Sequence, residues 1–494
     1  MKKQILKLFF TLCIVSTVLF AAACVTASAA SSGTCGENLT WVLDDSGTLT
    51  ISGTGPMRDY EKYDGGITAP WKGKTINNVK IEEGVTSIGD AAFYWNRSLK
   101  SISIPSSITK IGYTMFYTNS SPESIYIYDI AAWCNINFTD DFLYGVDNLY
   151  LNNKKVTDLV IPDGIKEIKK DAFSYCSSLT SITIPHSVIS IGESAFSYCK
   201  NLTNITISDG VTTIGGSAFS GCSKLSSVTI PDSVLSIGEG IFYGCTSLKE
   251  VTLPFIGSSR DANGTSDALF GYVFGNGFYE GQSAIQYYSP TASKQYTMPS
   301  NLRSVTITDA SIIPYGAFYN CSMIDNITLN SGVKTIYADA FYNCSNLVDL
   351  TIPGSKVKFA NSNVFTGCDM LTIYGIDGSS VEEYAQKYSI DFEPADISSQ
   401  GATALSATAT VLEGNIVITV KANGSTAEKY IPVAIYDKNG KMLDLMIVPS
   451  NESFDVAKVV FKDIKSAAYA KLFLWSTYSN LTPLSTAKQV NIVR

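Results

Sequence analysis

The sequence predicts a repeat solenoid, in which short coils stack with a parallel β-sheet along one face, followed by an all-β sandwich domain. Two observations favour this fold class. A unit of 23 residues recurs through the middle of the chain, and each unit contains a short stretch of alternating apolar and polar residues. With 45% hydrophobic residues, 16% charged residues and 37 glycines, the 494-residue chain is too apolar for disorder and too weakly charged for long helical bundles.

Residues 1–30 have the order of residues that is typical of a secretory signal peptide. Three lysines precede an apolar stretch from Leu8 to Val25, and Ala27-Ser28-Ala29 supplies small residues for cleavage. Lipidation at Cys24 is an alternative, although the leucine expected three positions earlier is missing. No later stretch of 18 apolar residues predicts a membrane span. We therefore expect a secreted, extracellular protein, either free or retained at the cell surface.

The charge balance and the residue types exclude several classes of function. The formal net charge is -8, and removal of residues 1–30 leaves 33 cations against 44 carboxylates, which is -11. Such a surface repels nucleic acid and anionic membranes. The single histidine, His186, leaves almost no material for a Ser-His-Asp triad or a histidine-rich metal site. The sequence therefore predicts a protein that is not an enzyme and has no metal or cofactor.

The repeat itself predicts the solenoid. The segment from Leu179 to Cys199 returns as Leu202 to Cys222 and as Leu225 to Cys245, a period of 23 residues. The first core residues of the predicted strands are Val79, Ile102, Ile125, Leu159, Ile182, Ile205, Val228, Val251, Val305, Ile327, Leu350 and Ile373. All gaps between them are 23 residues except three, of 34, 54 and 22 residues. Because one coil buries too little apolar surface to fold alone, the coils are expected to stack.

Each coil has a predictable internal order. An alternating strand ends at Pro185, a second extended stretch reaches Ile191, and Gly192 turns the chain. Three apolar residues then have the spacing of one inward-facing helical turn: Ala195, Phe196 and Cys199. The recurring phenylalanines predict one buried aromatic column: Phe93, Phe116, Phe173, Phe196, Phe219, Phe242, Phe318, Phe341 and Phe365. Core packing is a better explanation of this column than stacking on glycans.

The unit Leu-Thr-Ser-Ile-Thr-Ile-Pro-x-Ser-Val-x-Ser-Ile-Gly-x-x-Ala-Phe-x-x-Cys resembles the BspA-like leucine-rich repeat of secreted and surface bacterial proteins. The resemblance covers about residues 79–392. It implies adhesion or ligand binding outside the cell, and it carries over no catalytic residue. Residues 31–78, with the turn Asp45-Ser46-Gly47 between alternating strands, resemble the β-hairpin cap that often precedes such repeats.

Two insertions interrupt the period, near 128–156 and at 254–303. The first places Ala132–Ile136 and Asn148–Asn152 between two predicted strands, which predicts one oversized coil. The second adds about 31 residues, with these aromatic residues among glycines: Phe270, Tyr272, Phe274, Phe278, Tyr279, Tyr287, Tyr288 and Tyr296. Two interpretations stay open. Either the aromatic residues bind sugar rings or a protein, or they fold back as a plug over the interrupted sheet.

The pattern changes after the last repeat. Gly378–Tyr388 predicts a helix, with Ser379 or Ser380 as its N-cap, which resembles the terminal cap of a solenoid. Residues 393–402 are predicted to be a linker. Residues 403–494 carry strand patterns at Ile416–Lys421, Ile431–Tyr436, Leu443–Val448, Val456–Phe461 and Lys471–Trp475, and about seven strands predict a β-sandwich. The end of this domain is similar to a C-terminal module of clostridial extracellular proteins.

Seven of the eleven cysteines are spaced like the repeats: Cys176, Cys199, Cys222, Cys245, Cys321, Cys344 and Cys368. Thiols at one position of stacked coils lie on parallel vectors about 4.8 Å apart, whereas a disulfide needs facing Cβ atoms about 3.8 Å apart. We therefore expect a buried, reduced thiol column. Cys35 and Cys134 are off register, and a bond between them stays open. The absence of any C-x-x-C spacing argues against a zinc site.

The outward positions of the strands predict the candidate binding residues. If Ile182 and Ile184 point inward, Thr183 faces solvent, and the period places Thr206, Thr229, Thr252, Thr306, Thr328 and Thr351 in the same column. The β-propensity of threonine explains this column equally well. The hypothetical ligand-binding residues are Thr183, Thr206, Thr229 and Thr252 on the sheet and Tyr272, Tyr279, Tyr287 and Tyr288 in the insertion.

Three functions follow from these patterns. The leading one is a non-catalytic binding protein that presents the sheet, together with the 254–303 insertion, to an extracellular protein or polysaccharide. The alternative is a structural or accessory spacer that holds the C-terminal domain within an extracellular assembly. A polysaccharide-acting enzyme comes third, since no nucleophile and base are paired in the sequence.

Overall fold

The computed structural model describes residues 31–61, 68–94, 96–113, 122–139, 146–277 and 279–395, and the backbone of strands between 404 and 491. The predicted signal peptide, residues 396–402 of the predicted linker, Phe116 and Phe278 lie outside the described residues. The chain divides into two compact units. The first unit comprises Met1–Glu250, Gly271–Ser283 and Tyr296–Leu302, and the second comprises Val251–Phe270, Ala284–Gln295 and Arg303–Arg494.

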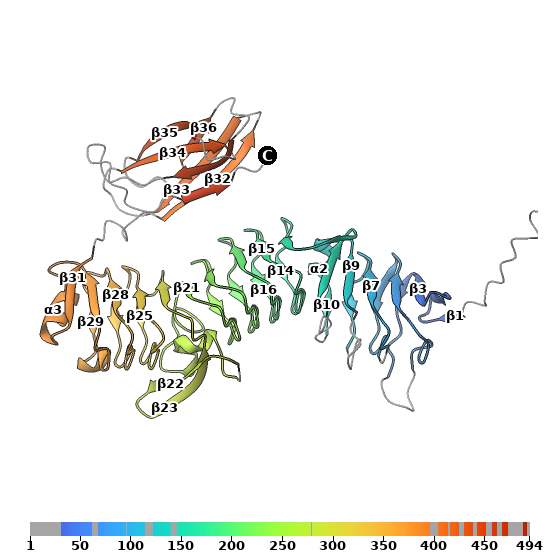
Figure 1. Ribbon diagram of the computed structural model, residues 1–494, viewed down its shortest axis with the longest axis horizontal. Helices are drawn as coiled ribbons and strands as arrows, with labels where there is room; N and C mark the ends of the chain where they lie inside the picture. Colours follow the sequence, from blue (N-terminus) through green and yellow to red (C-terminus); the bar gives the residue numbers. More distant parts are fainter. Residues whose placement is uncertain are drawn as a thin grey trace, which may run out of the picture. The chain divides into compact units, whose positions relative to one another are not determined.

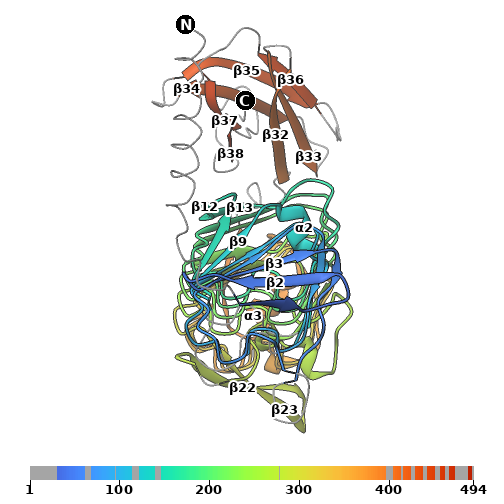
Figure 2. The same ribbon diagram turned by 90° about the vertical axis from the view of Figure 1, so that its right-hand side faces the viewer.

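The first unit begins with three antiparallel strands, and the third of them pairs in parallel with β5 (Figures 1 and 2). The sheet contains, in order, β1 Ser31–Thr34, β2 Leu39–Leu43, β3 Thr48–Gly53, β5 Asn78–Ile81, β7 Ser101–Ile104, β9 Ser124–Ile127, β11 Asn148–Leu151 and β12 Lys154–Lys155. A second sheet contains β4 Gly55–Pro56, β6 Val85–Ile88, β8 Lys110–Ile111 and β10 Asn137–Phe138. That residues 31–78 protect the end of the sheet stays a prediction.

The regular coils of the first unit carry two parallel sheets, as the period predicts. One contains β13 Asp158–Val160, β15 Ser181–Ile184 and β17 Asn204–Ile207. The other contains β14 Glu167–Ile168, β16 Ser190–Ile191, β18 Thr213–Ile214 and β20 Ser236–Ile237. A further strand, β19 Ser227–Thr229, belongs to neither of these two sheets. Residues 23 apart pair in register, so that Ile182 lies opposite Ile205. Pro185 follows β15 directly, because a proline cannot donate to the ladder.

The first interruption is not one oversized coil, so this prediction was wrong. It contains the helix α2 Ile130–Cys134 and the strand β11, and β11 pairs in parallel with β9 so that Leu149 lies opposite Ile125. A further coil of 24 residues is therefore present. The chain then folds back into β12, and the sheet restarts at β13. The sequence hid this coil because it lacks the usual Ala-Phe signature.

The predicted phenylalanine column forms the core, and its eight described members are buried. The ring centroids of Phe173 and Phe196 lie 5.4 Å apart, those of Phe196 and Phe219 lie 5.7 Å apart, and the rings within each pair are nearly parallel. The backbone repeats with the rings. The N–H group of Phe196 donates to the carbonyl oxygen of Ala218 in the next coil at 2.8 Å. Each coil thus satisfies a polar group of its neighbour while burying a ring.

The segment around Phe196 is a pair of tight turns, not the helical turn that its spacing predicted, whereas Phe365 ends the 3₁₀ helix of Ser362–Phe365. N–H groups bond three residues back, as Ser197 does to Ser194 at 3.0 Å, and both Ser194 and Tyr198 have left-handed backbone angles. An α-helix cannot contain such residues. Gly192 has no positive φ; a Cβ atom there would lie 2.5 Å from the backbone nitrogen of Lys170. It therefore permits close approach of two coils.

The nine described cysteines are all buried and free, so Cys35 and Cys134 are not bonded. In the column, the Sγ atom of Cys199 donates to the carbonyl oxygen of Phe173 at 3.2 Å, and Cys222 repeats this contact with Phe196 at 3.3 Å. Burial raises the pKa of the Cys176 thiol to about 12. The predicted buried thiol column is confirmed, and its reduced state in solution stays a prediction.

The second unit continues the same coil design. Its parallel sheet contains β21 Glu250–Leu253, β24 Ser304–Ile307, β26 Asn326–Thr328, β28 Asp349–Ile352, β30 Thr372–Gly375 and β31 Asp391–Pro394. A second sheet contains β25 Ile312–Ile313, β27 Thr335–Ile336 and β29 Lys358–Phe359. The short 3₁₀ helices are η1 Ser266–Ala268, η2 Phe270–Val273 and η3 Ser362–Phe365, and β22 Gln282–Ser289 with β23 Ala292–Met298 forms a two-stranded sheet.

The helix predicted after the repeats is α3, Ser380–Lys387. Ser379 is its N-cap and accepts a hydrogen bond from the N–H group of Glu382, which satisfies one of the free donors of the first turn. Val381 and Ala385 are fully buried on its inner face.

The described residues between 404 and 491 form seven strands in two antiparallel sheets. One sheet contains β32 Ala404–Leu412, β33 Asn415–Asn423 and β36 Ala457–Phe461. The other contains β35 Met442–Ser450, β34 Lys429–Asp437, β37 Ala467–Leu472 and β38 Lys488–Asn491. The strand predicted at Lys471–Trp475 lies four residues earlier, as β37. That the two sheets pack as a sandwich stays a prediction.

Candidate recognition surface

The predicted threonine column lies at the outward strand positions. Thr183 pairs in register with Thr206, and both are exposed, as is Thr229. Thr252 is half-buried. In the second unit three further threonines pair in register and are half-buried: Thr306, Thr328 and Thr351. The exposed hydroxyls are therefore concentrated in the first unit.

The outward face of the first sheet carries an aromatic pair that the sequence analysis missed. Tyr126 of β9 lies opposite Tyr150 of β11, and their rings stack with centroids 4.7 Å apart and an angle of 17°. Tyr126 also lines a hollow of about 240 Å³, together with Lys80, Ser103 and Tyr128, whereas Tyr150 does not line it. Tyr126 occupies the strand position of Thr183, and a search of outward positions for aromatic residues would have found it.

The 254–303 insertion contributes core residues to each unit separately. Phe274 packs on Phe242 with centroids 6.3 Å apart, and Phe270 packs on Phe318 at 4.9 Å. Both insertion rings and Tyr296 are fully buried. These aromatic residues therefore replace the phenylalanine of an absent coil.

Polar groups of the insertion also replace the backbone N–H donors that the absent coil would have supplied. The N–H group of Phe270 donates to the carbonyl oxygen of Ala317 at 2.9 Å, as a column phenylalanine does. Gln286, which is fully buried, donates through Nε2 to the carbonyl oxygen of Tyr319 at 3.1 Å. Much of the insertion thus serves packing and hydrogen bonding, as the plug interpretation expected.

The four predicted tyrosines of the insertion are only partly exposed. Tyr279 donates to the carbonyl oxygen of Thr297 and packs edge-on against Tyr243, and burial raises the pKa of its hydroxyl well above the usual range. Tyr287 tilts against Tyr319 with centroids 5.0 Å apart. Tyr272 and Tyr288 are half-buried. A role of these residues in ligand binding stays a prediction.

The turns of the first unit form another polar hollow, of about 320 Å³. Tyr175 and Tyr198 stack there with centroids 4.7 Å apart, and serine hydroxyls of neighbouring coils line it with Tyr243. His186 lies apart from these places in an exposed turn. Among the described residues, no three histidine, cysteine or acidic side chains gather as a metal site would require.

Parallel coils, a buried phenylalanine column and an outward strand face define a leucine-rich repeat solenoid. The BspA type leucine rich repeat region matches residues 71–137, 146–260 and 292–400 of this chain in six copies. The chain belongs to this family. No curated protein matches the chain.

Several solved structures are similar to the chain. A leucine-rich repeat protein from Eubacterium ventriosum is 24% identical, over 69% of this chain and 95% of its own, with a TM-score of 0.32. One from Bacteroides ovatus is 20% identical, over 73% and 99%, with a TM-score of 0.34. A leucine rich cell surface protein from Faecalibacterium prausnitzii is 23% identical, over 72% and 97%, with a TM-score of 0.27.

Proposed function

We propose that this protein is a non-catalytic recognition protein that presents the outward face of its first sheet to an extracellular protein or polysaccharide. The observation that carries the proposal is the stacked pair Tyr126 and Tyr150 beside a hollow with polar groups. Tyrosine offers a large amphipathic contact area at low entropic cost, and such residues often dominate binding energy. The exposed hydroxyls of Thr183 and Thr206 add a polar surface on the separate sheet of β13, β15 and β17 in the same unit.

The extracellular location rests on the chain's first residues and on its family. Residues 1–30 have the charged, apolar and small-residue order of a secretory signal. Among the described residues, no helix is long and apolar enough to cross a membrane. We also propose that the protein is retained at the cell surface. Its C-terminal domain would be a module like that of clostridial extracellular proteins.

Binding of the full-length protein to a panel of extracellular-matrix proteins and polysaccharides tests this function. Replacing both Tyr126 and Tyr150 with Ala should lower the affinity for the captured ligand by about tenfold or more. Replacing Thr183 and Thr206 with Val is the matched control and should matter less, because flat hydroxyl surfaces mainly add complementarity. Hydrolysis of a panel member would favour the enzyme interpretation, and no capture at all would favour the spacer.

The insertion is the competing location for the same function. Replacing Tyr287 and Tyr288 with Ala should leave binding intact if the first sheet is the site, since Tyr287 already packs on Tyr319. A loss of binding of about tenfold or more in this variant alone, with the coils still folded, would move the site to the insertion.

A further inference from the structure

The strand register places outward side chains of the first sheet in two rows that run across the strands. Each residue of a row lies directly opposite the next one. The tyrosine row contains Thr50, Lys80, Ser103, Tyr126, Tyr150 and Lys155. The serine row contains Thr48, Asn78, Ser101, Ser124 and Asn148. A ligand that lies across the strands therefore meets a new side chain of each row about every 4.8 Å.

The two rows carry hydroxyl, amide and amine groups around one aromatic pair. None of their eleven residues has a purely hydrocarbon side chain or a carboxylate. The centre of a protein–protein interface is more apolar than this. A sugar instead presents hydroxyls, which both donate and accept hydrogen bonds, and a tyrosine ring offers an apolar surface for its C–H groups. The composition of the rows therefore favours a polysaccharide over a protein.

Several polar groups of the rows are available to such a ligand. The Oγ atom of Ser101 donates to Oδ1 of Asn78 at 2.7 Å, which leaves the Nδ2 group of Asn78 as a donor. The rings of Tyr126 and Tyr150 are half-buried, and their hydroxyls make no hydrogen bond to any described residue. The two tyrosines thus combine a fixed ring with a hydroxyl that can bind a ligand.

The hollow of about 240 Å³ indicates a ligand that extends along the face. Its lining residues include Thr48 of β3 and Asn153 of the turn between β11 and β12, so the hollow crosses the face. Its volume is below the range of small-ligand pockets, about 300–1,000 Å³. A ligand that occupies this hollow therefore continues beyond it, as a chain of sugars does.

The charges beside the rows disfavour a polyanion. Lys80 is paired with Glu82 at 3.2 Å, so its charge is offset. The exposed residues Glu123 and Asp147 directly precede two members of the serine row. Lys155 is a single exposed cation at the end of the tyrosine row. In a chain with a net charge of -8, this face therefore suits a neutral ligand.

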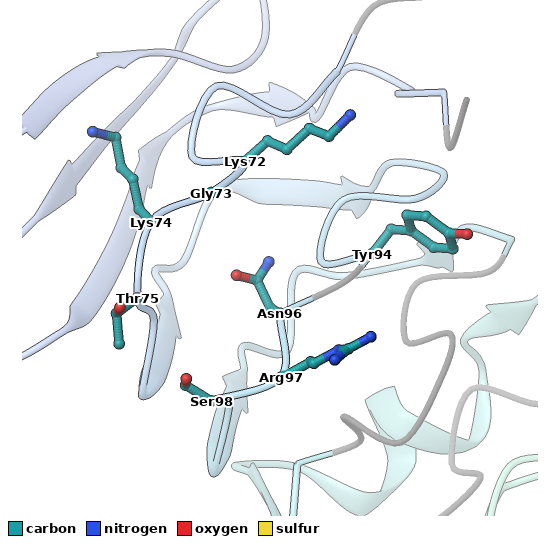
Figure 3. Close-up of a pocket in the computed structure, with 8 residues that line it drawn as sticks. All are labelled: Lys72, Gly73, Lys74, Thr75, Tyr94, Asn96, Arg97 and Ser98. Atoms are coloured by element: carbon teal, nitrogen blue, oxygen red, sulfur yellow. The ribbon is translucent and has the colours of Figure 1, made fainter. Parts of the chain in front are cut away.

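A larger hollow of about 340 Å³, shown in Figure 3, lies outside the two rows. Residues 72–75, 94 and 96–98 line it, and none of them belongs to a row. Its lysines and its arginine are therefore not members of the rows that would contact the ligand.

We propose that the two rows bind a neutral polysaccharide that lies across strands β3 to β11. This ligand class rests on the recognition function proposed above for the same face. The rings of Tyr126 and Tyr150 pack against sugar rings, and the amide of Asn78 and the hydroxyls of the rows exchange hydrogen bonds with sugar hydroxyls.

Affinity electrophoresis of the full-length protein tests the ligand class, with gels that contain dextran, galactomannan, mixed-linkage β-glucan or polygalacturonate. At least one neutral polysaccharide should retard the protein, and replacing both Tyr126 and Tyr150 with Ala should lower that affinity by about tenfold or more. Stronger retardation by polygalacturonate, or none by the neutral polysaccharides, would overturn the proposal. Capture of a protein through the same tyrosines would overturn the polysaccharide class and leave the recognition function standing. No capture of any polysaccharide or protein would overturn both.

Asn78→Val tests the serine row, because it removes the amide and keeps a residue that suits a strand. Affinity for the retarding polysaccharide should fall by about threefold or more, with an unchanged melting temperature. Asn326→Val is the matched control, since Asn326 is also half-buried and begins β26 as Asn78 begins β5. Equal affinities in the two variants would contradict the role of this row.

Lys155→Ala tests the neutral character of the ligand. The variant should keep its affinity for the polysaccharide, because a neutral sugar gains little from one exposed cation at the end of the row. A loss as large as that of the tyrosine pair would indicate an anionic ligand and would overturn the neutral class.

Discussion

At the scale of single residues, the cysteines of the repeat have a physical role that needs no disulfide. A thiol is small enough for a position between two stacked coils and is a weak hydrogen-bond donor. Cys245 and Cys344 each donate to the carbonyl oxygen of a phenylalanine in the preceding coil, at 3.2 and 3.1 Å. Each of these carbonyl oxygens also accepts a backbone N–H group within its own turn, Phe219 from Cys222 at 3.4 Å and Phe318 from Cys321 at 3.0 Å, so the thiol adds a second hydrogen bond that joins two coils.

The burial of the thiols predicts their reactivity. The pKa values of Cys176 and Cys245 are raised to about 12, because burial disfavours the thiolate. At about pH 8 both thiols are neutral in the folded protein, and iodoacetamide should leave them unmodified, since the thiolate is the nucleophile. Mass spectrometry should show alkylation after unfolding in urea. Rapid alkylation of the native protein, or a bond such as Cys199 to Cys222, would contradict the buried column.

At the scale of elements, a tryptophan side chain replaces a backbone hydrogen-bond donor where the repeats begin and again where they restart. In a regular coil, the backbone N–H group of the preceding phenylalanine donates to the alanine carbonyl. Trp71 Nε1 donates instead to Ala92 at 2.7 Å, and Trp133 Nε1 donates to Ala172 at 2.6 Å. The indole rings of both tryptophans are buried, and Trp71 stacks on Phe93. Each tryptophan thus supplies the N–H group that a column phenylalanine would supply, and Trp71 supplies the stacked ring as well.

Replacing Trp71 with Phe tests this role. The variant keeps a ring against Phe93 and removes the donor, so the Ala92 carbonyl is left buried without its partner. The free energy of unfolding should fall by about 1–3 kcal/mol, as measured by urea denaturation. Trp41→Phe is the matched control, because the buried Trp41 Nε1 has no hydrogen-bond partner. A loss in Trp41→Phe as large as that in Trp71→Phe would show that ring size, not the hydrogen bond, matters.

At the scale of the whole molecule, the stacked coils make stability a sum of contacts between neighbours. Phe219 lies between Phe196 and Phe242, with centroids 5.7 and 6.2 Å away. Phe219→Ala should therefore cost about 3–5 kcal/mol. Hydrogen exchange should show the lost protection centred on residues 202–245. Equal loss of protection in strands β32 to β38 would contradict a repeat array with local cooperativity.

Prediction from the sequence failed mainly at the two insertions that interrupt the repeat. The period predicted the register of the strands and the exposure of Thr183, Thr206 and Thr229, because a two-residue alternation alone decides which side chain faces solvent. It missed the stacked tyrosine pair. Tyr150 lies in a coil without the repeat signature, and only the pairing of β11 with β9 brings it against Tyr126.

The sequence by itself determined the coil and the phenylalanine and thiol columns, because these recur at short, fixed spacings. It also determined the helix after the repeats, because a cap residue and one apolar face mark it locally. Only the tertiary structure decided how the gaps are filled. Gln286 meets Tyr319 across 33 residues, and Trp133 meets Ala172 across 39 residues. Periodicity reports which residues share a face, whereas contacts between non-repeating segments depend on how the folded chain satisfies its remaining polar groups.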